Sequence, residues 1–155
     1  MKQFLKFSSI IAFGLALISF ILLLATPGVL YKIGSFSLEY SGIQILFGEE
    51  GVKGAVLPLI GWIFIVVCLA VLLCDVVAII LKKNFLAKFA KIINLVLAGL
   101  FVIAVVFIFL AVPSFLGANS INASDGFVIG AGWVIAAILS ILAGGVCFLK
   151  VILDK

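Results

Sequence analysis

Four long apolar runs constrain the fold of this chain more than any other feature. They cover residues 7–26, 55–81, 92–112 and 130–149. A bilayer core about 30 Å thick is crossed by about 20 apolar helical residues, so each run is long enough to span it. Because that core offers no water, the backbone polar groups of a spanning segment must be satisfied internally, which favours helices. The sequence therefore predicts an all-α integral membrane protein, a bundle of four transmembrane helices in a single domain of residues 1–155.

The composition agrees with a membrane protein. Of the 155 residues, 67% are hydrophobic and 10% are charged, whereas a soluble domain averages about 45–50% apolar and about 25% charged residues. Lys2 and Lys6 precede the first run, as they would in a secretory signal. However, the run exceeds the usual signal core of about 7–15 residues and lacks a small-x-small cleavage motif. We therefore expect an uncleaved first span.

The lysines predict the orientation of the bundle. All ten basic residues are lysines, and eight of them lie before the first run, in the 82–91 connection or after the fourth run. Under the positive-inside rule, both termini and the 82–91 connection are then cytoplasmic, and the 27–54 and 113–129 connections lie outside. The two tryptophans fall near the outer ends of the second and fourth runs, where an aromatic belt is expected. Pro113 is expected to end the third helix.

The first outer connection carries a strand pattern. Residues 29–33 and 36–40 favour strands with apolar side chains on one face, and a two-residue, glycine-first turn at 34–35 separates them. We predict a small β-hairpin that caps the outer helix ends. The next segment, 42–48, either continues as a third strand or forms a short interfacial helix. The cap is either a lid over apolar helix ends or a surface that binds a partner.

One candidate site lies inside the runs. Asp75 is the one acidic residue well inside a run, about 10 Å of helix rise from its inner end. An intramembrane carboxylate marks a proton or cation site by default, although a structural partner on the inner side would also explain it. The available structural partners are Lys88, Lys91, Lys150 and Asn94. The candidate intramembrane polar residues are Asp75, Asn94 and Ser140.

The fourth run has a stripe of small residues at every fourth position. The stripe consists of Gly132, Ala136, Ser140 and Gly144. Small residues at that spacing let another helix approach closely. The stripe therefore serves either an interface with a partner or a second copy, or packing within the four-helix unit.

Enzymatic chemistry is not indicated. The chain has no His, the side chain most often used as a general base near neutral pH. It shows no phosphate-binding glycine loop, zinc spacing, nucleophile elbow or nucleic-acid motif. Glu49 and Glu50 offer oxygen ligands for a divalent cation, but the further ligands of a calcium loop are missing, so a solvated turn is the preferred interpretation. We expect no catalytic residues, no metal site, no cofactor and no nucleic-acid partner.

Three stretches carry a resemblance to a family. The start MKQFLK, the Thr26–Pro27 exit from the first run and SGIQILFG at 41–48 resemble small, uncharacterised four-span membrane proteins of low-GC Gram-positive bacteria and mollicutes. The most specific of these residues are Gly42, Gln44, Phe47 and Gly48. The layout is also similar to the claudin arrangement, but the first outer connection lacks the Trp and paired Cys of the claudin signature. The first resemblance implies a bacterial cytoplasmic membrane, and neither resemblance implies site residues.

A functional expectation follows from these features. We expect a non-enzymatic multi-pass membrane protein, an accessory or interaction subunit of the bacterial cytoplasmic membrane. The alternative is an oligomeric channel or small transporter subunit, whose polar path would use the three intramembrane polar residues. The expected partners are the lipid bilayer and either another membrane protein or further copies of this chain.

Overall fold

The computed structural model describes residues 2–81, 89–122 and 125–153 of the chain. Four helices of this part are long and apolar enough to cross a membrane. They are α1 (Lys2–Ala25), α3 (Val56–Ile80), α4 (Ala90–Phe109) and α6 (Ala131–Leu153). The prediction of four long apolar helices is therefore confirmed. Of the predicted inner connection 82–91, residues 82–88 lie outside the described part of the chain.

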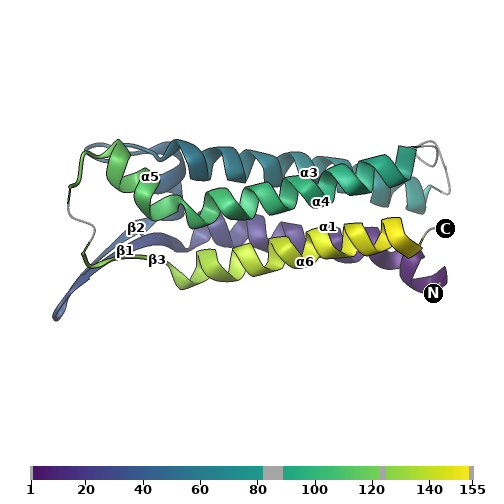
Figure 1. Ribbon diagram of the computed structural model, residues 1–155, viewed down its shortest axis with the longest axis horizontal. Helices are drawn as coiled ribbons and strands as arrows, with labels where there is room; N and C mark the ends of the chain where they lie inside the picture. Colours follow the sequence, from purple (N-terminus) through teal and green to yellow (C-terminus); the bar gives the residue numbers. More distant parts are fainter. Residues whose placement is uncertain (1, 82–88, 123–124, 154–155) are drawn as a thin grey trace.

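The four long helices form an elongated bundle. They run side by side, with the start of α1 and the end of α6 at one end and a small β-sheet at the other (Figure 1). We call these ends the terminal end and the sheet end. α1 packs against α3 and α6, and α4 packs against the same two helices, so each long helix has two long neighbours. Clusters of buried apolar side chains fill both halves of the bundle.

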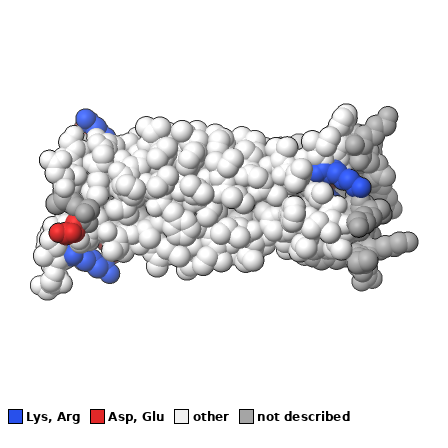
Figure 2. Space-filling model, in the orientation of Figure 1, with Lys and Arg blue, Asp and Glu red and all other residues white. Residues whose placement is uncertain are grey.

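The outer surface of the bundle is apolar along its length. Large side chains such as those of Ile18, Val102 and Ile138 point outward and are more than half exposed. Figure 2 shows charged side chains toward both ends of the visible face and none in the middle. An exposed apolar surface of this extent is unusual for a soluble monomer. The structure is therefore compatible with a multi-pass membrane protein.

A three-stranded antiparallel sheet lies at the sheet end. β1 (Pro27–Ile33) lies between β2 (Phe36–Ser41) and β3 (Phe127–Ile129). β1 and β2 form the predicted hairpin. At its turn, Gly34 has a φ of +60° and Ser35 keeps a negative φ, as a glycine-first turn requires. β3 comes from the second predicted outer connection, where the sequence does not predict a strand.

Two short helices complete the sheet end. α2 (Gly42–Phe47) follows β2, so the segment 42–48 forms a helix and not a third strand. α5 (Ala111–Ala118) follows α4 after a break at Leu110. The expectation that Pro113 ends the third helix is therefore wrong, because the run breaks earlier and Pro113 lies in the first turn of α5. At that position its missing N–H removes no helical hydrogen bond.

Two glycines allow close backbone contacts where the sheet joins the helices. Gly42 donates its N–H to the carbonyl of Thr26 (3.0 Å), and Gly130 donates to the carbonyl of Gly28 (2.9 Å). A Cβ at Gly130 would lie 1.9 Å from the carbonyl oxygen of Pro27, and one at Gly42 would lie 1.8 Å from another carbonyl oxygen. Any other residue at either position would therefore force the backbone apart.

We expect Gly130→Ala to destabilise the protein by about 1–3 kcal/mol, because the added methyl group collides with neighbouring backbone. Gly14→Ala is the control, since a Cβ at Gly14 meets nothing within 4 Å. It should be neutral or stabilise α1 by up to about 1 kcal/mol. Thermal unfolding in detergent micelles measures both changes. Equal stability of the two variants would contradict the close contact at Gly130.

Candidate functional site

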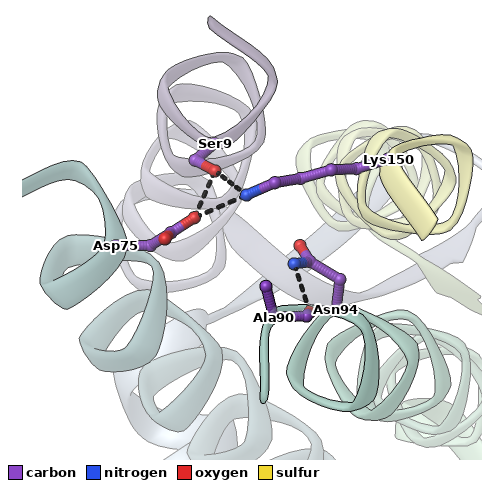
Figure 3. A network of polar contacts seen from close by, with 5 residues as sticks. All are labelled: Ser9, Asp75, Ala90, Asn94 and Lys150. Atoms are coloured by element: carbon purple, nitrogen blue, oxygen red, sulfur yellow. Dashed lines mark hydrogen bonds and ion pairs between the residues drawn. The ribbon is translucent and has the colours of Figure 1, made fainter. Parts of the chain in front are cut away.

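A polar cluster lies inside the bundle near the terminal end. Asp75 of α3 meets Lys150 of α6 and Ser9 of α1 (Figure 3). The Nζ of Lys150 lies 2.7 Å from Oδ2 of Asp75 and 2.7 Å from Oγ of Ser9. The Ser9 hydroxyl donates to the same carboxylate oxygen. One ion pair and one hydroxyl therefore join three of the four long helices. We call Ser9, Asp75 and Lys150 the polar cluster.

The polar cluster is largely shielded from its surroundings. The side chain of Lys150 is 14% exposed and that of Asp75 is 23% exposed, while Ser9 is buried. An isolated charge in an apolar interior is costly, but opposite charges that share hydrogen bonds offset much of that cost. Lys150 also lies in the last turn of α6, where a cation interacts favourably with the helix dipole.

The long lysine side chain determines which helices the cluster joins. Figure 3 shows it extending from α6 to a point between Ser9 and Asp75. Lysine stems pack well along apolar surface while the ammonium group reaches a polar partner. Among the partners that the sequence leaves open for Asp75, the structure places Lys150 in contact. Asn94 is buried close by, but it donates to the carbonyl of Ala90 in its own helix (2.7 Å).

Ser140 lies in a second polar contact, closer to the sheet end. Its hydroxyl lies 2.7 Å from the hydroxyl of Ser19, which also donates to the carbonyl of Ala136 (2.8 Å). Ser140 and Lys150 are ten residues apart on α6, which corresponds to about 15 Å of helix rise. The three candidate intramembrane polar residues therefore do not form one site.

The small-residue stripe of α6 packs inside the chain. A Cβ at Gly132 would lie 2.1 Å from the hydroxyl oxygen of Thr26, and one at Gly144 would lie 3.0 Å from the Cβ of Phe101 on α4. The two middle members of the stripe face α1 through the hydrogen bonds with Ser19. Of the two uses that the sequence leaves open, the geometry shows packing within the four-helix unit.

The motif at 41–48 forms a capped helix. Gln44 donates its backbone N–H to the Ser41 hydroxyl (3.2 Å), and the Ser41 N–H donates to the side-chain oxygen of Gln44 (3.0 Å). This is a capping box, and its S-x-x-Q spacing is readable in the sequence. Gly48 follows the helix with a φ of +78°, and Phe47 sets its ring edge-on to Trp62, with centroids 5.3 Å apart. These contacts, and the close contact at Gly42, give the residues of the motif a structural role.

Two serines of α1 take part in polar contacts that the sequence does not single out. They are Ser9 and Ser19, ten residues apart in the first run, just as Ser140 and Lys150 are ten residues apart in the fourth. Two antiparallel helices with equal spacing bring both pairs into contact at once. Equal spacing of polar residues in the two runs is therefore the signal that could have found these serines.

The polar cluster has the chemistry of a structural ion pair. The Lys150 ammonium and the Ser9 hydroxyl both donate to one oxygen of Asp75, so the negative charge is compensated. Within residues 2–81, 89–122 and 125–153, no group of three or more His, Cys, Asp or Glu side chains could hold a metal ion. In this geometry the cluster fixes the relative positions of α1, α3 and α6.

We expect Asp75→Asn and Lys150→Met each to destabilise the bundle, because each leaves the partner charge uncompensated. The double variant should lose less stability than the sum of the single variants, with a coupling free energy of about 0.5–3 kcal/mol. Thermal unfolding of the four proteins in detergent micelles gives this cycle. Strictly additive losses would rule out a direct interaction between the two side chains.

Comparisons with protein-family models, with curated proteins and with solved structures find no match to this chain. The resemblance to four-span bacterial membrane proteins, and the looser one to claudins, therefore stay expectations from the sequence.

Proposed function

We propose that the protein is a non-enzymatic, multi-pass subunit of a bacterial cytoplasmic membrane that binds a partner membrane protein through its β-hairpin. The four long apolar helices support membrane insertion. The uneven distribution of lysines between the two ends of the bundle supports an orientation with the terminal end in the cytoplasm and the sheet end outside. The motif at 41–48 resembles bacterial four-span proteins, and this resemblance supports a location in a bacterial membrane.

The observation that carries the proposal is an apolar hairpin face that the rest of the chain covers only in part. The cross-strand pairs of this face are Val29–Tyr40, Tyr31–Leu38 and Ile33–Phe36. Near the helices the face is covered, since Val29 is buried and the Tyr40 ring packs on a phenylalanine of α5 with centroids 4.7 Å apart. Toward the turn it is open, and Ile33, Phe36 and Leu38 are 54%, 56% and 45% exposed. We call these three residues the hairpin patch.

The position of the hairpin patch favours a partner over a simple lid. A lid over the helix ends needs only the covered half of the face, whereas the hairpin extends past the helices with its turn farthest from the bundle (Figure 1). In the described sheet, β2 is an edge strand, so its outer backbone groups can pair with a further strand. Apolar side chains beside such an edge are typical of a protein–protein contact.

The alternative function, an oligomeric channel or small transporter subunit, has less support. An ionisable residue inside a predicted span favours it in principle. In this chain, however, Lys150 compensates the charge of Asp75, and Ser140 lies about 15 Å further along α6. Across the described residues, these side chains do not line up as a continuous polar path.

We expect Phe36→Ser/Leu38→Ser to reduce co-purification of the partner about tenfold or more after gentle extraction from the native membrane, because apolar anchors dominate such interfaces. The matched control is Ser37→Ala/Glu39→Gln, which changes the opposite face of the same strand and should retain the partner. Mass spectrometry of the extracted complexes gives the stoichiometry.

Both hairpin variants should keep the thermal stability of the unmodified protein, because all four side chains are exposed. A wild-type protein that is extracted as a monomer without any partner would contradict the proposal. Equal loss of the partner from the two variants would also contradict it, since the contact would then not be specific to the apolar face.

A further inference from the structure

A groove lies between α4 and α6 on the outer surface of the bundle. It has a volume of about 570 Å³, within the range of roughly 300–1,000 Å³ that is typical of small-molecule sites. Its lining includes Gly99 of α4 and Gly145 of α6. A Cβ at either glycine would meet nothing within 4 Å, so packing does not require them, although glycine weakens a helix relative to alanine. Their effect is to keep the groove open.

One helical turn beyond the groove, toward the terminal end, the same face of α4 carries a lysine. Lys91, Leu95, Gly99 and Val102 follow one another on α4 at spacings of four, four and three residues, so they lie on one face of the helix. Lys91 is exposed, and among the described residues no carboxylate forms an ion pair with it. From Lys91 to Val102 the helix rises by about 16 Å, close to half of a bilayer core about 30 Å thick. The distance from the lysine to the far end of the groove therefore matches the thickness of one leaflet.

The charge at the end of the groove identifies the occupant. An acyl chain suits the apolar lining, and a phosphate headgroup would give Lys91 the counter-charge that it lacks. Lys150 of the neighbouring helix α6 is turned inward onto Asp75 and does not compete for the headgroup. In the described residues of the four long helices the one carboxylate is Asp75, which is already paired, so a spanning helix of a second copy would bring Lys91 no free counter-charge. Anionic lipids are abundant in the cytoplasmic leaflet, which the lysine distribution assigns to this end.

We propose that the groove between α4 and α6 binds one acyl chain of an anionic phospholipid, with Lys91 holding the headgroup. The inference rests on the proposed membrane insertion and is independent of the partner of the hairpin patch.

Native mass spectrometry tests the inference. The protein is extracted from its membrane, and its bound lipids are exchanged for phosphatidylglycerol or phosphatidylcholine. The unmodified protein should retain one phosphatidylglycerol per chain. Gly145→Leu fills the groove and should lose the retained lipid. Gly14→Leu is the matched control, because it adds the same side chain to an open position on α1, and it should keep the lipid. Lys91→Gln should keep a lipid but lose about fivefold preference for phosphatidylglycerol.

Gly99→Leu fills the same groove from α4 and should reproduce the loss if Gly145→Leu folds poorly. If Gly145→Leu and Gly99→Leu retain as much lipid as the unmodified protein, the retained lipid comes only from the surrounding bilayer. That result would overturn the inference. A dimer without retained lipid that Gly145→Leu disperses would overturn it in favour of a second copy. If cell fractionation recovers the protein in the aqueous fraction and not in the membrane, the proposed function is overturned together with this inference. Membrane-embedded protein that keeps its hairpin partner but retains no lipid would overturn this inference alone.

Discussion

The contact between α1 and α6 is the interaction on which the rest of the structure depends. Ser9 meets Lys150 and Ser19 meets Ser140, so ten residues forward on α1 correspond to ten residues back on α6. Between these polar contacts the helices bury small side chains such as Ala12. Hydrogen bonds between helices in a membrane contribute only about 0.6 kcal/mol on average. Close packing of small residues and the polar contacts must therefore act together to pair these helices.

The same register continues from the helices into the sheet. β1 follows α1 and β3 precedes α6, and Val29 pairs with Ile129. At the junction, the Trp133 indole N–H donates to the carbonyl of Leu23 (3.1 Å). A strand of three residues has little stability of its own, so β3 forms because α6 holds it beside β1. The helix pair thereby places the sheet, and the sheet places the hairpin patch beyond the bundle.

Much of the fold could be predicted from the sequence, because the signals are local. Length and hydropathy predict the four helices, and alternation with a glycine-first turn predicts the hairpin. β3 could not be predicted, because its partner strand lies about a hundred residues earlier and only the helix register brings the two together. The end of the third helix cannot be predicted from Pro113, because proline can stop a helix or begin one, and local sequence does not distinguish these roles.

The candidate site shows the same division between local and long-range information. Asp75 could be found from the sequence, because a carboxylate inside an apolar run is conspicuous. Its partner could not be chosen, since several long lysine side chains gather on the same side and only the order of helices in the bundle decides among them. Ser9 could not be singled out from the sequence, because serines in apolar runs are common and the role of each depends on the side chains that it contacts.

The central claim is the pairing of α1 with α6 within one chain. Oxidative cross-linking of Ser19→Cys/Ser140→Cys in native membranes tests it most directly, with the native Cys68, Cys74 and Cys147 replaced by Ala. The two hydroxyls lie 2.7 Å apart, so the account predicts a disulfide within a single chain under mild oxidation. It predicts none for the offset pair Ser9→Cys/Ser140→Cys, whose members lie about 15 Å apart along the bundle. Disulfides formed between chains, or formed equally by both pairs, would contradict the account.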